Sequence, residues 1–145
     1  MKIYKAAVIG LSHISQARSP KPSSMPAVQP MPRSHVAAYA AHPQTELVGA
    51  CDLMPAAFER FNNTWRDVHP NTSLYTDYRE MLAQEKPDIV SVITPDDKHA
   101  DIVVNVADSG VKGIWCEKPI ATTLADADRM IEAVERNGVA MTVSH

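Results

Sequence analysis

Lys5-Ala-Ala-Val-Ile-Gly10 is a short run of small and β-branched residues that ends at a glycine. A run of this kind, with no polar alternation, is typical of a strand buried on both faces, and the glycine predicts a turn at its carboxyl end. Similar runs recur along the whole chain. We expect these further strands at residues 46–51, 73–76, 88–94, 112–116 and 139–143.

Segments with a helical spacing of apolar residues separate these strands. Ser34, Asp77 and Thr123 stand where N-caps are expected, and Gly110 and Gly138 stand where helices should stop. The alternation of strands and helices predicts an α/β fold, a doubly wound parallel sheet in the order 3-2-1-4-5-6 with helices on both faces. The expected helices are 35–41, one beginning at Pro55, 78–84, 96–109 and one from Thr123 to about 137.

Charge and hydropathy argue against nucleic acid and membranes as partners. The chain of 145 residues has a formal net charge of −3 and a pI near 6.0. It shows no basic face that could bind a polyanion. No apolar run approaches the roughly 20 residues that cross a bilayer, and the N-terminus lacks the apolar segment of a signal peptide. We therefore expect a cytoplasmic protein with no nucleic-acid and no membrane partner.

Cys51 and Cys116 are the two cysteines of the chain. They are too few for a disulfide framework or, by themselves, for a zinc site, and we expect no metal. In the 3-2-1-4-5-6 order they end strands that are three spacings apart, roughly 14 Å. A disulfide spans less than about 7 Å between Cα atoms, so both thiols are expected to be free.

A proline-rich segment interrupts the pattern at about residues 16–33. It holds five of the eleven prolines and no acidic residue, and it shows no apolar periodicity. We interpret it as a loop or disordered insert in one domain that spans residues 1–145. Its basic side chains Arg18, Lys21 and Arg33 are candidate phosphate contacts, and a solvated loop is the alternative.

The hexapeptide Gly10-Leu-Ser-His-Ile-Ser15 has the position of a G-x-G-x-x-G dinucleotide fingerprint. In a doubly wound sheet, ligands bind outside the carboxyl ends of the strands, where this turn lies. Only the first glycine is present, because Ser12 and Ser15 occupy the other two positions. An ordinary strand-to-loop turn is therefore the alternative interpretation. The residues expected to bind the cofactor here are Gly10, Leu11, Ser12, His13 and Ile14.

Asp52 follows the second predicted strand. A carboxylate at this position can accept hydrogen bonds from both ribose hydroxyls of an adenosine and repel a 2′-phosphate. Its distance from Gly10 exceeds the usual interval of about 20 residues by close to the length of the insert. Leu53 and Met54 include no arginine to neutralise a phosphate, so NAD is favoured over NADP as the cofactor. A simple helix N-terminal acid before Pro55 is the alternative.

Glu117 and Lys118 follow the fifth predicted strand. There they face the nicotinamide side of the expected cleft, and the lysine could hydrogen-bond a substrate hydroxyl and help to remove its proton during hydride transfer. We take Lys118 as the catalytic candidate. A solvated ion pair between these two neighbours is the alternative.

Together these segments resemble the N-terminal domain of the glucose-fructose oxidoreductase, inositol dehydrogenase and MocA family (Gfo/Idh/MocA). The resemblance covers nearly the whole chain apart from the insert, and the Glu-Lys-Pro motif in this register is specific. The segments that carry it are the first strand and turn, 46–52, 75–78 with Met81 and Leu82, 88–95 with His99 and Ala100, and 117–119 with the helix that follows.

The resemblance implies a role for several residues. Thr94 and Pro95 are expected to line the ribose and pyrophosphate of the cofactor, with His99 nearby. Glu117 is expected to lie near the nicotinamide ribose, and Lys118 to contact nicotinamide and substrate. One further residue, His35, matches a histidine that follows the glycine loop in many members, and an exposed helix histidine is the alternative.

The resemblance also implies a second domain that this chain lacks. Family members continue into an open antiparallel sheet that supplies substrate contacts and much of a homo-oligomer interface. Two other departures are the serines in the fingerprint and the insert, which separates the glycine loop from its helix.

The leading functional hypothesis is the cofactor-binding domain of an NAD(P)-dependent oxidoreductase. It would transfer hydride between nicotinamide and a sugar, cyclitol or related secondary alcohol, with the dinucleotide and a small polyol or sugar as partners. The alternatives are a non-catalytic nucleotide-binding sensor or interaction module, and a truncated inactive product.

Overall fold

The computed structural model describes residues 1–18 and 31–144 and contains one six-stranded sheet in the order β3-β2-β1-β4-β5-β6. Every neighbouring pair of strands in it is parallel. The predicted strand order 3-2-1-4-5-6 and the α/β fold class are therefore confirmed. The strands are β1 (Tyr4–Ile9), β2 (Thr45–Cys51), β3 (Ser73–Tyr75), β4 (Ile89–Val92), β5 (Gly113–Cys116) and β6 (Ala140–Val143).

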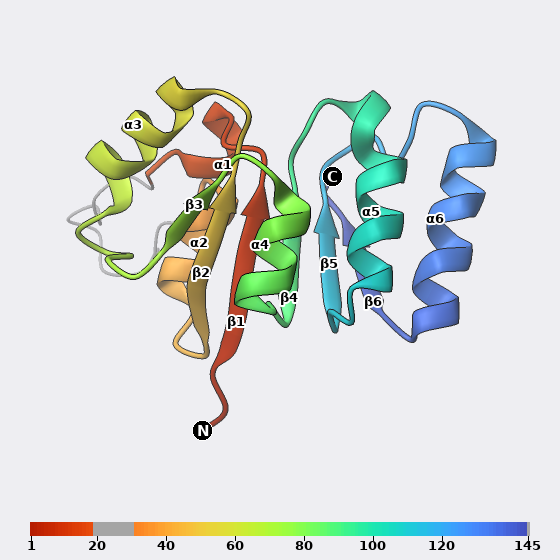
Figure 1. Cartoon of the computed structure of the whole chain (residues 1–145), viewed down its shortest axis with the longest axis horizontal. Coiled ribbons are helices and arrows are strands. Elements are labelled where there is room, and N and C mark those ends of the chain that lie inside the picture. The colour runs from red at the N-terminus through yellow and green to blue at the C-terminus, as the bar shows by residue number, and fades with distance from the viewer. Residues whose placement is uncertain (19–30, 145) are drawn as a thin grey trace.

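Helices cover both faces of the sheet. Figure 1 shows α4, α5 and α6 on the near face, with α2 behind the sheet. This arrangement follows from right-handed crossovers between parallel strands. The helices are α1 (His13–Gln16), α2 (His35–Ala41), α3 (Pro55–Trp65), α4 (Tyr78–Glu85), α5 (His99–Asp108) and α6 (Leu124–Asn137), with a short 3₁₀ turn η1 (Asp96–Lys98) before α5.

Alternate residues of β1 supply two hydrophobic cores. Ala7 and Ile9 join the cluster beneath α4, α5 and α6. Ala6 and Val8 face the other way and join the cluster formed with α2 and α3. All four are at most 3% exposed, which explains why the run reads as uniformly apolar: a central parallel strand has no solvent-facing side.

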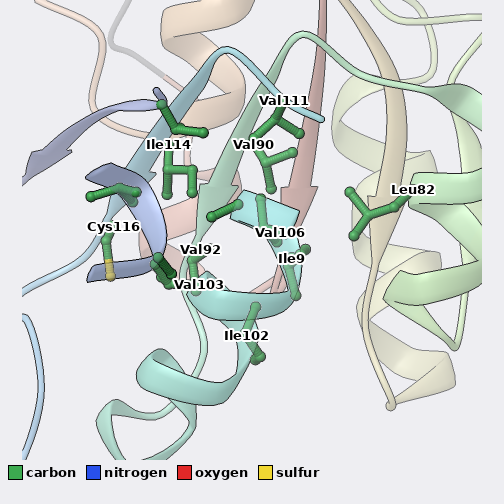
Figure 2. Packing of buried hydrophobic residues seen from close by; sticks show 14 of the residues in the cluster. Ile9, Leu82, Val90, Val92, Ile102, Val103, Val106, Val111, Ile114 and Cys116 are labelled. Atoms are coloured by element: carbon green, nitrogen blue, oxygen red, sulfur yellow. The ribbon is translucent and has the colours of Figure 1, made fainter. Parts of the chain in front are cut away.

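The larger core lies between the near face of the sheet and α5 (Figure 2). Val90 and Val92 of β4 pack there against Val103 and Val106 of α5, and all four are fully buried. Ile114 of β5 continues the layer. The spacing of Val103 and Val106 places them on one face of the helix, as the apolar pattern predicted.

The predicted helix ends are confirmed. Ser34, Asp77 and Thr123 each accept a hydrogen bond from a backbone N–H in the first turn of the following helix. Gly138 closes α6 with a positive φ of 65°. Each signal is local, because a cap needs only the residue and the helix beginning or ending beside it.

Several boundaries differ from the prediction: the strand expected at 88–94, for example, spans Ile89–Val92. The helix expected at 96–109 begins as the 3₁₀ turn η1 and becomes α-helical only at His99. Gln16, which the prediction placed at about the start of the insert, belongs to α1, is 5% exposed and donates to the Leu11 carbonyl at 2.7 Å. The remainder of this prediction falls largely on residues 19–30, which lie outside the described residues.

Both cysteines are free and buried, as predicted. Within the described ranges 1–18 and 31–144, no helix is long and apolar enough to cross a membrane.

Candidate functional site

Backbone hydrogen bonds continue past the strand ends and gather the following loops at one edge of the sheet. Gly10 N donates to the Cys51 carbonyl at 2.8 Å, and Glu117 N donates to the Val92 carbonyl at 3.0 Å. A third such bond, from Asp52 N to the Tyr75 carbonyl, measures 3.1 Å. The loops after β1, β2, β4 and β5, which carry the predicted site residues, are therefore tied to neighbouring strands.

Gly10 makes the turn after β1 possible. Its φ is +96°, a conformation that L side chains rarely adopt. A Cβ at this position would lie 2.7 Å from the carbonyl carbon of Ile93, closer than real Cβ atoms approach backbone. The glycine thus allows the loop to pass directly over the end of β4.

Asp52 links the loop after β1 to the end of β2. Its Oδ2 accepts from Leu11 N at 2.7 Å, and its Oδ1 accepts from Met54 N at 2.8 Å. Because an ionised carboxylate has about four acceptor sites, these two bonds leave acceptor capacity for a ligand. The carboxylate is half-buried, whereas the Leu53 and Met54 side chains beside it are 81% and 63% exposed.

The two serines of the incomplete fingerprint have different environments. Ser15 is completely buried, and its hydroxyl donates to the Ser12 carbonyl at 2.6 Å. The turn therefore accommodates a side chain at the third glycine position. Ser12, like His13 and Ile14, is exposed. The helix that follows, α1, has four residues, so little of a helix dipole is available to phosphate groups at this loop.

The side chain of Arg18 is held by α3 and the turn that follows it, and is not free to reach the loop after β1. Its guanidinium donates to the Thr64 carbonyl, pairs with Asp67 at 2.5 Å and lies 5.1 Å from the centre of the Trp65 ring. Together with Arg33 it lines a cavity of about 750 Å³. The third predicted phosphate contact, Lys21, lies outside the described residues. Also lining that cavity are His13, Ile14, Gln16, Ala17, Arg60 and Thr64.

Thr94 has an unused hydroxyl at the end of β4. Its Oγ1 is buried, and it has no hydrogen-bond partner among residues 1–18 and 31–144. Pro95, the next residue, is exposed. A buried hydroxyl without a partner costs free energy, so an external polar group at this position would stabilise it.

His99 is 1% exposed, so its side chain is buried and does not lie on the surface of the site. Its Nδ1 is 2.9 Å from the Pro119 carbonyl oxygen, and its Nε2 is 3.0 Å from the Thr94 carbonyl oxygen. The imidazole therefore connects the loop after β4 to the loop after β5.

His35 lies beneath Glu117, although it is 82 residues away along the chain. Its Nε2 is 2.9 Å from Glu117 Oε1, and its Nδ1 is 3.0 Å from Ser91 Oγ. Tyr39 OH lies 2.7 Å from the same Ser91 oxygen. His35 is 2% exposed, so the alternative interpretation as an exposed helix histidine is wrong.

The environment favours the neutral form of His35 and the ionised form of Glu117. Burial lowers the pKa of His35, and the hydrogen bond to Glu117 opposes this effect without reversing it. Burial works against ionisation of Glu117, but hydrogen bonds from His35 and Ser144 hold the pKa of its carboxyl below the usual range. At neutral pH the site therefore contains a neutral imidazole and an ionised carboxylate.

Lys118 extends from the loop after β5 into solvent. The residue is exposed, and its ammonium makes no ion pair or hydrogen bond within the described part of the chain. Its backbone N–H contacts Glu117 Oε2 at 3.3 Å, and the following bond to Pro119 is cis. A free ammonium and a fixed carboxylate thus stand side by side at the carboxyl end of β5.

The sequence analysis missed four residues that support Glu117. Ser91 carried one signal that could have revealed it, because it is a polar residue inside a strand expected to be buried on both faces. Tyr39, Trp115 and Ser144 carried no local signal. The indole ring of Trp115 lies 3.8 Å from the His35 ring, centre to centre, and its Nε1 donates to Ser144 Oγ at 2.8 Å.

The described residues contain no group of three or more His, Cys, Asp or Glu side chains that could hold a metal ion. An incomplete glycine fingerprint, an acid after β2 and a lysine after β5 instead surround the point where the strand order reverses, between β1 and β4. In doubly wound sheets this point is the dinucleotide site.

The sequence model of the GFO_IDH_MocA family, described as an oxidoreductase family with an NAD-binding Rossmann fold, matches residues 30–145. The chain belongs to this family. The family binds a nicotinamide dinucleotide through its Rossmann fold. The match begins after the glycine loop, so it leaves residues 1–29 to be interpreted from the structure.

Two curated relatives are dehydrogenases. Inositol 2-dehydrogenase of Salmonella typhimurium is 31% identical over 100 residues, which are 66% of this chain and 27% of that protein. D-apiose dehydrogenase of Paraburkholderia graminis is 37% identical over 111 residues, which are 77% of this chain and 28% of that protein. The chain therefore spans less than a third of either relative.

A solved structure agrees with the same assignment. The WlbA dehydrogenase of Bordetella pertussis, crystallised with NADH and UDP-GlcNAcA, superposes with a TM-score of 0.78 at 26% identity. The superposition covers 99% of this chain and 37% of that one.

Proposed function

We propose that residues 1–145 form the dinucleotide-binding unit of an NAD-dependent oxidoreductase. The reaction would transfer hydride between nicotinamide and a hydroxyl-bearing carbon of a sugar, cyclitol or related secondary alcohol. The observation that carries the proposal is the ammonium of Lys118, which has no partner among the described residues, beside the fixed carboxylate of Glu117 at the carboxyl end of β5. The two dehydrogenase relatives and the NADH-bound WlbA structure support it.

The residues at the strand ends fit a dinucleotide. Gly10 makes the tight turn that brings the loop after β1 over the end of β4, because this position tolerates no Cβ. Thr94 offers a buried hydroxyl that has no partner among the described residues, and Pro95 lines the same loop. The exposed loop residues Ser12 and His13 would contact the phosphates from the side of β1.

Asp52 favours NAD over NADP. Its carboxylate stands at the end of β2 with acceptor sites to spare, so it would accept hydrogen bonds from the adenosine ribose hydroxyls and repel a 2′-phosphate. Leu53 and Met54 place no cation beside it. Both features disfavour a dianionic phosphate at this point.

Lys118 would act on the substrate. Bound nicotinamide supplies the acceptor for a hydride from the carbon that bears the substrate hydroxyl. Lys118 would hydrogen-bond that hydroxyl and, as the neutral amine, take its proton as the carbonyl forms; in the reverse direction its ammonium would return a proton to the developing alkoxide. Glu117, fixed by His35, would accept a hydrogen bond from the nicotinamide ribose. Both ring nitrogens of His99 lie against backbone carbonyls, of Pro119 and Thr94. We therefore propose that His99 positions the loops after β4 and β5 and does not itself contact the cofactor or the substrate.

A titration with NADH tests this proposal. NADH fluorescence should change saturably on addition of the folded chain, and Gly10→Ala should weaken binding at least tenfold because its Cβ would collide with Ile93. Gly110→Ala is the matched control, since Gly110 also has a positive φ of 90° but a Cβ added there would meet no atom within 4 Å. A folded chain that leaves millimolar NADH unbound would contradict the proposal.

A further inference from the structure

Four polar side chains form a continuous chain of contacts from the interior to the site. It begins at Tyr39 OH, passes through Ser91 Oγ at 2.7 Å and His35 Nδ1 at 3.0 Å, and leaves His35 Nε2 for Glu117 Oε1 at 2.9 Å. The first three residues are at most 6% exposed. Glu117 is the member that reaches the loop after β5, where its side chain is 15% exposed.

One arrangement of protons gives every buried donor in this series of four side chains an acceptor. The Glu117 carboxylate only accepts, so His35 must donate to it from Nε2. A neutral imidazole then accepts at Nδ1, and Ser91 donates to it. Tyr39 in turn donates its phenolic proton to Ser91. Burial raises the pKa of Tyr39 to about 12, so this proton is retained at neutral pH.

A doubly protonated His35 fits the same contacts less well. It would donate to Ser91 from Nδ1, so Ser91 and Tyr39 would hold two hydroxyl protons with a single acceptor between them. One buried hydroxyl would then lack a partner, which costs free energy. Both ends of this series of contacts therefore favour the same direction: Glu117 only accepts, and the two hydroxyls fit an unprotonated Nδ1 better than an Nδ1–H.

Trp115 and Ser144 hold the same pair from a second side. The Trp115 ring packs on His35 at 3.8 Å between centres, with 38° between the planes. Its Nε1 donates to Ser144 Oγ at 2.8 Å, and Ser144 also hydrogen-bonds Glu117. The imidazole therefore cannot rotate without displacing a ring that is itself fixed to the end of β6.

We infer that His35 is a positioning residue, which in its neutral Nε2–H form holds Glu117 Oε1 and leaves Oε2 directed to the cofactor. Oε2 lies 3.3 Å from Lys118 N, a long contact that leaves this oxygen acceptor capacity. The inference rests on the proposed function, since it assigns the partner of Oε2 to a hydroxyl of the nicotinamide ribose. Ser91 and Tyr39 act by selecting the tautomer of His35.

Two substitutions of His35 separate positioning from simple packing. Glutamine places its amide nitrogen near the position of Nε2 and can still donate to Glu117. Asparagine carries the same amide one methylene shorter, near Nδ1, and cannot reach Glu117. We expect His35→Gln to bind NADH within about threefold of the unsubstituted chain, and His35→Asn about tenfold or more weakly, as loss of a hydrogen bond to a charged group implies.

The tautomer of His35 can be measured without cofactor. In ¹⁵N-labelled chain at neutral pH, we expect the His35 Nε2 signal of a protonated nitrogen and the Nδ1 signal of an unprotonated one. Ser91→Ala removes the donor to Nδ1, and we expect it to shift the His35 signals toward a mixture of tautomers. This variant provides the test if substitution of His35 itself prevents folding.

The outcomes distinguish this inference from the proposed function. An Nδ1–H or doubly protonated His35 at pH 7 would overturn the inference, as would equal NADH affinities for folded Gln and Asn variants. An Nε2–H tautomer that Ser91→Ala perturbs, together with weaker binding by the Asn variant, would support it. Failure of the unsubstituted chain to bind NADH would overturn the proposed function, while the cofactor-free spectrum still reports on His35.

Discussion

Asp52 Oδ2 accepts the backbone N–H of Leu11 at 2.7 Å, so the acid that follows β2 also fixes the loop that follows β1. One carboxylate thus holds the glycine loop and keeps acceptor sites for a ligand, which we propose to be the adenosine ribose. This arrangement offsets part of the incomplete fingerprint, because the loop is held by a charged hydrogen bond as well as by glycine geometry.

Asp52→Asn should weaken NADH binding and reduce the preference for NADH over NADPH. The amide has one acceptor oxygen in place of two, and it no longer repels a 2′-phosphate. We expect the ratio of the two dissociation constants to move about tenfold toward NADPH, measured by fluorescence titration. Asp128→Asn, at an exposed position of α6, is the control and should leave the ratio unchanged. An unchanged ratio in a folded Asp52→Asn chain would remove Asp52 from the ribose site.

Lys118→Ala should separate turnover from cofactor affinity. The ammonium makes no ion pair or hydrogen bond within the described residues, so its loss should leave the fold unchanged, and the NADH dissociation constant should change much less than kcat. In a preparation that oxidises a sugar or cyclitol, kcat should fall by about 10²–10⁴, the usual contribution of a general acid–base group. Lys2→Ala, near the opposite end of the sheet, should change neither quantity. Full turnover by Lys118→Ala would assign proton transfer to another group.

Features that depend on neighbouring residues were predictable from the sequence. The caps at Ser34, Asp77 and Thr123, the stop at Gly138 and the double burial of β1 each need only the residues beside them. The strand order then followed from parallel strands joined by helices, together with the known preference of such sheets.

The interior of the site was less predictable, because it depends on long-range contacts. The approach of His35 to Glu117 joins residues 82 positions apart, and it requires β4 and β5 to lie side by side. The sequence marks His99 as a candidate to lie near the cofactor. Its burial between two carbonyl oxygens depends on how the loops after β4 and β5 pack, which no local pattern shows. The spacing of apolar residues predicts which face of a helix is buried, but it does not predict which loop that face will contact.

Met130→Ala should destabilise the chain by about 2–5 kcal/mol, because it removes a buried side chain from the α6 contact with the core. Met130 is completely buried. Leu124, on the same helix, is 86% exposed, and Leu124→Ala should change the free energy of unfolding by less than about 0.5 kcal/mol. Urea unfolding followed by circular dichroism measures both. Equal effects of the two substitutions would contradict the packing of α6.

The two thiols should be unreactive until the chain unfolds. Burial raises the pKa of Cys51 and of Cys116 to about 12, and the neighbouring carboxylates Asp52 and Glu117 add to the effect. The thiolate is the reactive form, so a disulfide reagent at pH 8 should modify neither residue rapidly in the folded chain. Two equivalents should react promptly in denaturant. Fast reaction of one thiol under native conditions would show local opening of its strand end.

Stability should fall as the pH is lowered from 7.5 to 5, with His35 as a main cause. Burial holds the folded-state pKa of His35, and also that of His69, below the ordinary value of 6.5. Below pH 6.5 the unfolded chain therefore binds protons that the folded chain does not, and the free energy of unfolding decreases by at most about 1.4 kcal/mol per pH unit for each histidine. Above about pH 7.5 both states are neutral at these positions, so the two histidines contribute no slope there.

Denaturant titrations of the unsubstituted chain and of His35→Gln at pH 5, 6, 7 and 8 measure this contribution. Glutamine does not titrate, so the variant should lose part of the slope between pH 5 and 7 and keep the part that His69 supplies. Glu117 acts at lower pH, since its folded-state pKa lies below 4.5. Its contribution should be present above that value and lost as the pH falls through the folded-state pKa. A slope that is identical in both chains between pH 5 and 7 would show that His35 is protonated equally in the folded and unfolded states, and this result would contradict the neutral imidazole at the site.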